Sequence, residues 1–205
     1  MTTSSKAWSL GILLGGESRR MGSDKALLSL GSESLLERTA RRLSVGAEEV
    51  LLSVGTSPRD LPPSLSKCRQ TLDDMLGEGP LIGLASLLEA SQTPWVLVVP
   101  CDQPLLDSEH VSPLFDNSDS ARGVHFAHSH RPRPFPLLIH TDCLGALLDL
   151  IGCGSRRLVE LLDAIGFSAV APSDQAAEAV DFNLNTPEDL KRWRDLERRG
   201  LVDGP

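Results

Sequence analysis

The stretch Pro94-Trp-Val-Leu-Val-Val-Pro100, followed at once by Cys101-Asp102-Gln103-Pro104, decides the fold class of this chain. Every residue between the two prolines is apolar, and three of them are β-branched valines. A short run that is apolar on both faces is typical of a central strand in a parallel sheet, which helices cover on both sides. The sequence therefore predicts a buried strand over 94–100, with Asp102 just beyond its carboxyl end.

Short apolar runs and helical patterns alternate on both sides of that strand. The other expected strands cover 8–14, 49–55 and about 167–171, with two more inside 123–140. The expected helices cover 35–43, 79–90, 108–115, 142–151 and 155–165, and a last one opens at Thr186-Pro187. Alternation of this kind without repeats predicts an α/β fold: one domain over residues 1–205 with a mostly parallel, Rossmann-like doubly wound sheet.

The first expected helix carries a clear start signal, because Ser34 and Glu37 form an S-x-x-E capping box. One face of this helix is apolar or small, and consists of Leu35, Leu36, Thr39, Ala40 and Leu43. Arg38, Arg41 and Arg42 lie elsewhere on the helix. The pattern therefore predicts that these arginines point away from the core.

Composition narrows the function classes. The chain has 205 residues and a net charge of −8. An acidic protein repels nucleic acid and anionic membranes, so neither is expected as a partner. Its four cysteines show no C-x-x-C and no metal-ligand spacing, which favours reduced, mostly buried thiols. No apolar run reaches the roughly 18 residues that span a bilayer, and no signal peptide is evident, so a cytoplasmic protein is expected.

A glycine-containing loop with cationic side chains follows the first strand. It has neither the G-x-G-x-x-G fingerprint nor the G-x-x-x-x-G-K-[ST] motif. Gly15-Gly16 alone most often marks a turn, but Arg19 and Lys25 follow within ten residues. Backbone N–H groups left accessible by glycine approach phosphate oxygens, and Arg and Lys neutralise the charge. The combination favours a phosphate site.

Asp102 is the candidate metal ligand. In a doubly wound sheet ligands bind beyond the carboxyl ends of the strands, which places Asp102 opposite the cationic loop. Taken alone, an aspartate after a strand is as often a turn or a cap. Beside bound phosphates, however, Mg²⁺ is usually held by one or two carboxylates. The chain shows no Ser-His-Asp, Cys-His or H-E-x-x-H arrangement, so catalysis by alignment and charge neutralisation is expected.

The segment L-x-G-G-x-S-x-R-M-G-x-D-K, Leu13 to Lys25, resembles the signature loop of the molybdenum cofactor guanylyltransferases. These enzymes are nucleotidyltransferases with a glycosyltransferase-A-like α/β fold. The resemblance continues in order over about residues 8–196. Its further motifs are Asp73 before Gly79-Pro80-Leu81-Ile82-Gly83, then Pro100 to Pro104, Pro136-Leu137, Arg156-Arg157 and Asn183-Leu184-Asn185-Thr186-Pro187-Glu188-Asp189.

The resemblance implies transfer of GMP from Mg-GTP to the terminal phosphate of molybdopterin, with release of pyrophosphate. Its functional positions, carried over by match, are Leu13, Leu14, Gly15 and Gly16 at the guanine and ribose, Arg19 and Lys25 at the triphosphate, Ser53 and Asp73 at the nucleotide, Asp102 at Mg²⁺ and the α-phosphate, and Asn183, Asn185 and Arg156 at the pterin. Transient contact with molybdoenzymes or their chaperones is also implied.

This chain departs from the family pattern at three positions. Leu14 stands where the family usually has Ala, and Ser53 stands where the family often offers Asn to the nucleotide. Asp73 and Asp74 are adjacent, so either can fill the acidic position; Asp73 lies seven residues before Pro80, the usual spacing. Leu14 predicts a base pocket lined differently from that of the family, and Ser53 predicts a contact with the nucleotide that is weaker or lost.

Several other functions remain open from the sequence. The related CTP-dependent cytidylyltransferases typically begin the loop with Ala-Ala-Gly, whereas Gly15-Gly16 favours guanine. A transferase for another phosphorylated acceptor is a further possibility. From a different class, the chain could be a catalytically silent nucleotide-binding or chaperone-like module for a molybdoenzyme. Lys25 and Asp102, both present, argue against the silent module.

Overall fold

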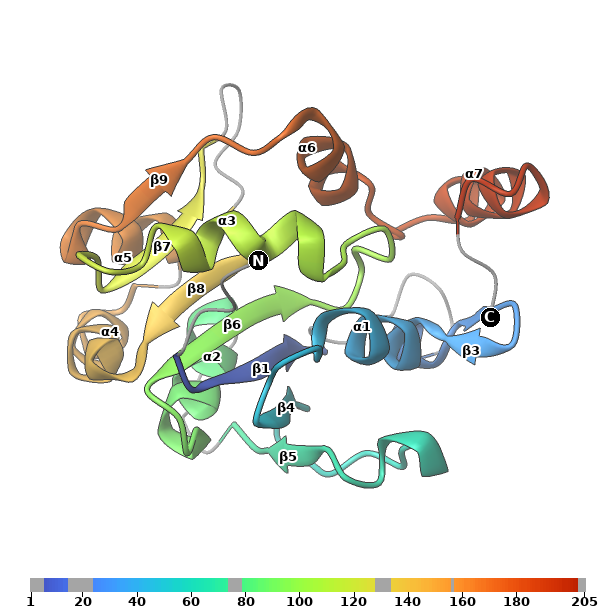
Figure 1. Cartoon of the computed structure of the whole chain (residues 1–205). Coiled ribbons are helices and arrows are strands. Elements are labelled where there is room, and N and C mark those ends of the chain that lie inside the picture. Colours follow the sequence, from blue (N-terminus) through green and yellow to red (C-terminus); the bar gives the residue numbers. More distant parts are fainter. Residues whose placement is uncertain (1–5, 15–23, 74–78, 128–133, 156, 203–205) are drawn as a thin grey trace.

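The computed structural model of the chain describes residues 6–14, 24–73, 79–127, 134–155 and 157–202 (Figure 1). Its centre is a seven-stranded sheet with the order β5-β4-β1-β6-β8-β7-β9. The strands of this sheet are β1 (Trp8–Leu13), β4 (Glu49–Ser53), β5 (Arg69–Thr71), β6 (Trp95–Pro100), β7 (Gly123–Phe126), β8 (Leu137–His140) and β9 (Ser168–Val170). A separate antiparallel hairpin pairs β2 (Ser29–Leu30) with β3 (Glu33–Ser34).

The large sheet is mostly parallel, as the sequence predicts. Strands β5, β4, β1 and β6 run parallel to one another, and β7 runs parallel to β9. Strand β8 is antiparallel to both of its neighbours, β6 and β7. The short β7–β8 connection makes this reversal possible, because a parallel pair needs a longer crossover.

Helices cover both faces of the sheet (Figure 1). They are α1 (Leu35–Leu43), α2 (Pro80–Ala90), α3 (Ser108–Asp116), α4 (Leu144–Gly152), α5 (Leu158–Ile165), α6 (Asp174–Asp181) and α7 (Pro187–Arg198). Three single turns of 3₁₀ helix are η1 (Lys25–Leu27), η2 (Pro63–Leu65) and η3 (Thr141–Cys143). Among the described residues, no helix is long and apolar enough to cross a membrane.

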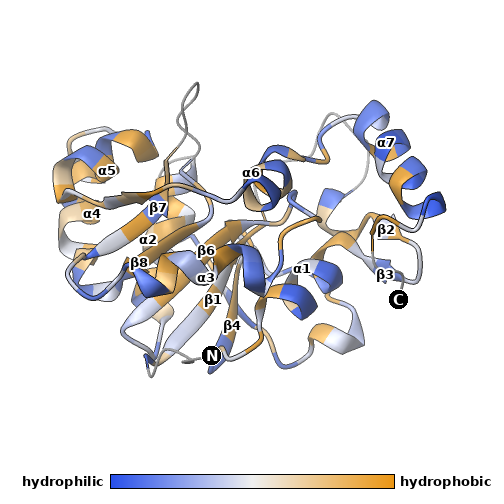
Figure 2. Cartoon of the chain, turned by 45° about the horizontal axis from the view of Figure 1, so that its top comes forward, coloured by the Kyte–Doolittle hydropathy of each residue, from blue (hydrophilic) through white to orange (hydrophobic). Residues whose placement is uncertain are grey.

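The core divides into two layers because successive side chains of a strand point to opposite faces of the sheet. In β6, Leu97 and Val99 pack with α1, α3 and α6. Their neighbours Val96 and Val98 pack with α2, α4 and α5 on the other face. Figure 2 shows the strands as a hydrophobic layer between helices with hydrophilic outer faces. β6 is therefore the buried central strand that its sequence predicts.

A third, smaller apolar cluster joins the β2–β3 hairpin to the end of the chain. It contains Leu30, Leu35, Phe182, Leu184, Trp193 and Val202. Figures 1 and 2 both show α7 on the same side of the molecule as this hairpin, away from the seven-stranded sheet. The cluster fixes the segment that follows α6, which carries Asn183 and Asn185, against the N-terminal half of the chain.

The predicted elements are confirmed to within a few residues, and so are two helix caps. Ser34 and Glu37 form the capping box of α1, and Thr186 and Asp189 form that of α7. The prediction for Arg38 is wrong: its side chain is buried, with 2% exposure. The reason is that α1 is covered on a second side, where Arg38 lies over the Trp193 ring of α7.

Candidate functional site

The order in which strands are added to the sheet changes direction between β1 and β6. The chain passes from β1 to β4 on one side, and β6 adds later on the other side. In open α/β sheets, the crevice outside the carboxyl ends of such strands is where ligands bind. The three strands are joined here, because Leu14 N donates to Ser53 O (3.1 Å) and Cys101 N donates to Leu13 O (3.2 Å). Lys25 and Asp102 follow these strand ends.

Three of the predicted site residues meet at this point. Lys25 Nζ donates to Asp102 Oδ2 (3.0 Å) and to Asn185 Oδ1 (2.6 Å). The side chains of Lys25 and Asp102 are 14% and 21% exposed, so their pair is partly shielded from water but open to a ligand. The contacts bring together the segments after β1, after β6 and before α7.

Lys25 is the first residue of η1, and its neighbour Asp24 fixes the turn. Asp24 caps η1 by accepting from Ala26 N (3.1 Å). Both carboxylate oxygens of Asp24 also accept from Arg59 Nη1, at 3.1 and 2.9 Å. The sequence analysis did not single out Arg59, because its place in a proline-rich loop gives no sign that it reaches Asp24. Because Asp24 adjoins Lys25, the Arg59–Asp24 ion pair fixes the backbone from which the Lys25 side chain extends.

Residues 180–189, from the end of α6 to the first turn of α7, fix the backbone around Asp102 and Asn185. Leu184 N donates to Asp102 O (2.9 Å), and Gln103 Nε2 donates to Val180 O (2.9 Å). Asn185 N donates to Asp189 Oδ2 (2.9 Å) at the start of α7. Desolvation opposes ionisation of Asp189, but hydrogen bonds from Asn185 and Thr186 hold its pKa below the usual range. The backbone around Asn185 is thus tied to an ionised helix cap.

The thiol beside Asp102 is inert. Burial, with a smaller contribution from the charge of Asp102, raises the pKa of Cys101 to about 12. A nucleophilic cysteine needs a depressed pKa and an accessible sulfur. All four cysteines are free thiols as expected, with Cys101 and Cys143 buried and Cys153 exposed. The site therefore offers no cysteine nucleophile.

Asp73 lies in a second polar group near the end of β4. Its Oδ1 accepts from Ser86 Oγ (3.1 Å) and lies 3.5 Å from Ser53 Oγ. Helix α2 crosses closely over Ser53, because a Cβ on Gly83 would lie 2.6 Å from its hydroxyl oxygen. Ser53 is only 5% exposed. In this arrangement the Ser53 hydroxyl faces Asp73 beneath Gly83 rather than an open cleft.

The remaining predicted residues divide into those placed elsewhere and those not described. Leu13 and Leu14 are buried, and the Leu14 N–H is already used by the sheet, so it is not a donor for a ligand. Asn183 Nδ2 donates to Asp181 O (3.2 Å), which turns its amide onto α6 and not toward Lys25. Gly15, Gly16, Arg19, Asp74 and Arg156 lie outside the described residues.

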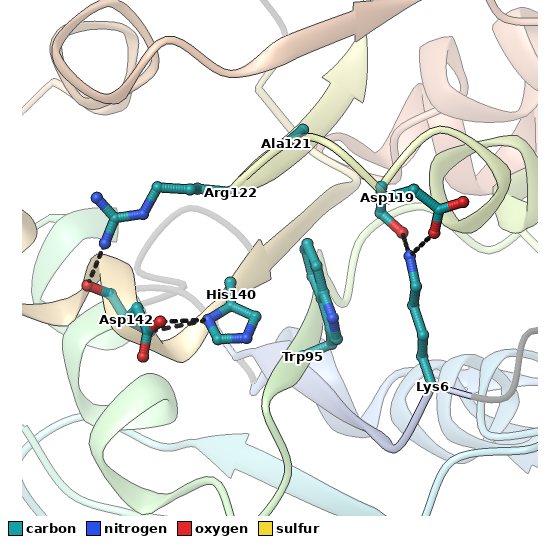
Figure 3. Close-up of a pocket in the computed structure, with 8 residues that line it drawn as sticks. Lys6, Trp95, Asp119, Ala121, Arg122, His140 and Asp142 are labelled. Carbon is teal, nitrogen blue, oxygen red and sulfur yellow. Dashed lines mark hydrogen bonds and ion pairs between the residues drawn. The ribbon is translucent and has the colours of Figure 1, made fainter.

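A cavity of about 340 Å³ lies at the opposite edge of the sheet, where β6 begins (Figure 3). Trp95, the first residue of β6, lies between His140 and Lys6. The lining side chains of the cavity contact one another: Lys6 Nζ pairs with Asp119 Oδ1 (2.6 Å), and His140 Nδ1 accepts from Asp142 N (3.2 Å). A six-residue strand separates this cavity from Asp102, a distance of roughly 20 Å. The cavity is therefore no part of the Lys25–Asp102 site.

The donor set fits a cation that arrives with a phosphate ligand. The described residues contain no group of three or more His, Cys, Asp or Glu side chains that could hold a metal ion by themselves. Asp102 supplies one partly exposed carboxylate at the strand end. Mg²⁺ is commonly held by one or two carboxylates together with substrate phosphates and water. Asp102 fits such a site, provided that the ligand brings the other oxygens.

A mostly parallel sheet with a lysine and a carboxylate at its switch point defines the class of α/β nucleotide-binding proteins. The family model of the MobA-like NTP transferase domain matches residues 10–169. The chain belongs to this family, and it is a nucleotidyltransferase.

The comparisons with individual proteins agree with the family. The chain is 30% identical over 204 residues to the molybdenum cofactor guanylyltransferase of Serratia proteamaculans, with 94% of this chain and 95% of that protein covered. Its fold matches molybdopterin-guanine dinucleotide biosynthesis protein A from Archaeoglobus fulgidus, with a TM-score of 0.74, 20% identity and coverage of 93% and 99%. It also matches 2-C-methyl-D-erythritol 4-phosphate cytidylyltransferase from Thermus thermophilus, with a TM-score of 0.66, 23% identity and coverage of 94% and 99%.

Proposed function

We propose that this chain transfers GMP from Mg-GTP to the terminal phosphate of molybdopterin, forming the guanine dinucleotide cofactor and pyrophosphate. The observation that carries the proposal is the meeting of Lys25, Asp102 and Asn185 at the switch point of the sheet. The guanylyltransferase relative that aligns over nearly the whole chain supports both the nucleotide and the acceptor. We extend the proposal to a single cytoplasmic catalytic unit with its core over about 8–196.

The chemistry needs alignment and charge neutralisation rather than a general base. An oxygen of the acceptor phosphate, already an anion, forms a bond to the α-phosphorus of GTP. The bond from that phosphorus to the bridging oxygen breaks, and the electron pair leaves with pyrophosphate. Lys25 is held by Asp102 and Asn185. Its ammonium group would neutralise the charge that develops on the triphosphate, and Arg19 would assist it.

Asp102 would hold Mg²⁺ at the α-phosphate through its carboxylate. The chemistry that the ion supplies when bound is neutralisation of phosphate charge during displacement. Lys25 already contacts Asp102 Oδ2 at 3.0 Å, so the ammonium and the carboxylate are positioned for the same phosphate group. The neutral Cys101 thiol beneath Asp102 adds no competing nucleophile.

The two substrates would lie on opposite sides of the Lys25–Asp102 pair. On the nucleotide side, the segment Leu13 to Gly16 would contact guanine and ribose, and Asp73 would contact the nucleotide. Ser53 would act there through Asp73, given the 3.5 Å between their side-chain oxygens. On the acceptor side, Asn183, Asn185 and Arg156 would bind the pterin. Transient transfer of the product to molybdoenzymes or their chaperones would follow.

The experiment that tests this function compares GTP and CTP with the purified chain, molybdopterin and Mg²⁺. We expect pyrophosphate release with GTP to exceed release with CTP by about 100-fold, since a site built for one base rejects another that leaves polar groups unpaired. A preference for CTP would identify a cytidylyltransferase, whose fold is also compatible with this structure. No release with either nucleotide would favour the silent nucleotide-binding module.

A further inference from the structure

The least expected side chain in the structure is Arg38, in the middle of α1. It is 2% exposed, whereas the sequence pattern places it on the polar side of the helix. Burial lowers the pKa of its guanidinium below the usual range, which shows that the surroundings oppose the charged form. A cation in such a place needs well-oriented partners.

The partners of Arg38 come from three parts of the chain. Its Nε donates to the Pro104 carbonyl (3.0 Å), in the loop that carries Asp102. Its Nη1 donates to Glu33 Oε1 (3.1 Å), and the guanidinium lies 4.8 Å from the centre of the Trp193 ring. The planar guanidinium group has N–H donors in fixed directions, so it can contact the carbonyl, the carboxylate and the ring at the same time. A lysine ammonium group cannot reproduce this geometry.

Two neighbouring side chains of α1 face the same loop. Arg42 Nε donates to the Leu106 carbonyl at 3.2 Å. The Thr39 hydroxyl donates to the Leu35 carbonyl of its own helix at 2.9 Å and also lies 3.4 Å from the Cys101 carbonyl. With Arg38 on Pro104, the helix therefore contacts main-chain carbonyls on both sides of Asp102. These contacts fix the loop by its backbone and leave the Asp102 carboxylate pointing to Lys25.

The counter-charge of Arg38 is itself held in the ionised form. Hydrogen bonding from Arg41 lowers the pKa of Glu33, and Arg38 adds to this effect. Glu33 thus remains a carboxylate below the ordinary range of glutamate titration. A buried ion pair is weak evidence for stability, because well-packed apolar residues often serve as well. The contacts of Arg38 therefore indicate that it orients the loop of Pro104 rather than adding to stability.

We propose that Arg38 is a positioning residue for the proposed reaction: through the Pro104 carbonyl it sets the place of Asp102 relative to Lys25. The inference rests on the proposed function, because it concerns the carboxylate assigned to Mg²⁺. Arg38 does not touch the reacting atoms; it acts through the backbone of 101–106. A shift of about 1 Å in a catalytic group can cost about 100-fold in rate, so a small displacement of this loop is enough to matter.

The test compares Arg38→Lys and Arg38→Met with the matched control Arg41→Met. Arg41 lies on the same helix and also binds Glu33, through Nη2 at 2.8 Å, but its side chain is 52% exposed. Two quantities are measured per folded molecule: kcat with GTP and molybdopterin, and the affinity for Mn²⁺ in the presence of GTP, read by electron paramagnetic resonance. GTP affinity without metal and thermal unfolding are measured in parallel.

We expect Arg38→Lys to lower kcat by about 30-fold and to weaken Mn²⁺ binding by about 10-fold. Metal-free GTP affinity should stay within about twofold, because the contacts of Arg38 given above are with Glu33, Pro104 and Trp193 and not with the described residues of the nucleotide side, Leu13, Leu14, Ser53 and Asp73. The control Arg41→Met should stay within about twofold in every assay. Arg38→Met is expected to unfold at a lower temperature than the wild-type chain. In that case Arg38→Lys, which keeps the charge, is the variant that decides the test.

Unchanged kcat and Mn²⁺ affinity in folded Arg38→Lys would overturn the inference and leave the proposed function standing. Equal losses in Arg38→Lys and Arg41→Met would overturn it as well, since Glu33 and not the Pro104 contact would then be responsible. A wild-type chain that neither transfers GMP nor binds Mn²⁺ with GTP would overturn the proposed function, and the inference with it.

Discussion

The two ends of β6 carry the same kind of ion pair in different surroundings. At the carboxyl end, Lys25 contacts Asp102 at 3.0 Å; at the amino end, Lys6 contacts Asp119 at 2.6 Å. The Asp102 side chain is 21% exposed, while that of Asp119 is 87% exposed. Asp102 is also held through its backbone by Leu184 N. Preorganised charges in partly shielded sites are the ones that stabilise a transition state, so only the pair at the carboxyl end is suited to catalysis.

The largest expected difference between the two ends concerns their carboxylates. Asp102→Ala should lower the proposed GMP transfer by about 1,000-fold or more, because it removes both the proposed metal ligand and the partner of Lys25. Asp119→Ala should change the rate by less than about twofold. Pyrophosphate release measures both, with circular dichroism to check that each variant is folded. Near-wild-type transfer by Asp102→Ala would remove the metal-ligand assignment.

The second largest difference is expected between variants of the two lysines, Lys25 and Lys6. Lys25→Met should lower the rate by about 100-fold, because the site then lacks the ammonium group proposed to neutralise the phosphates. Lys6→Met should leave the rate unchanged and cost at most about 1 kcal/mol of stability, the usual worth of an exposed pair. Steady-state kinetics and urea unfolding give the two quantities. Equal rate losses in both variants would contradict the division between the two ends.

The thiols near each end are expected to have the smallest effect on the reaction rate, and their effect is on stability. Burial raises the pKa of Cys101, near Asp102, to about 12, and it also raises the pKa of Cys143, near the amino-end cavity. These groups stay protonated in the folded chain while the unfolded chain ionises at about pH 8.5. Their contribution to stability is therefore complete below that pH and is lost as the pH rises through the raised pKa of each thiol, about 12 for Cys101, by up to about 1.4 kcal/mol per pH unit and group.

Urea unfolding between pH 8 and 10 measures this loss of stability. Cys101→Ala should flatten the decline, whereas the control Cys153→Ala should not, because Cys153 is exposed. A thiol reagent at pH 8 should label Cys153 rapidly and Cys101 only after unfolding. Rapid labelling of Cys101 in the folded chain would show that the carboxyl end is less shielded than the structure indicates.

The fold was predictable where pattern and burial agree. Strand β6 is apolar throughout and buried up to its last residue, and α1 combines a capping box with a continuous apolar face. Sequence reasoning missed β5, whose residues Arg69-Gln-Thr71 carry no apolar run, and α6, whose sequence is short and polar. β5 is an edge strand, and α6 buries only Ala176, Ala179 and Val180, so pairing and packing rather than composition decide these two elements.

The site was predictable in its residue types but not in its contacts. The position of Asp102 after an apolar strand was enough to place it opposite Lys25, because strand ends converge. The contact of Lys25 with Asn185 and that of Asp24 with Arg59 depend on how loops fold across one another. Arg38 was misplaced because helical periodicity describes one buried face, and α1 is covered on two sides.

The bond between Lys25 and Asn185 joins residues 160 positions apart in the chain. During synthesis, an emerging polypeptide can form the first strands and expose Lys25 long before Asn185 has left the ribosome. At the pace of translation, about 5–20 residues per second, that interval lasts on the order of 10 s. The half-made molecule has a lysine without its amide partner and a carboxylate loop without the Leu184 bond. The Lys25–Asp102 site is therefore assembled only after the segment that precedes α7 has been synthesised.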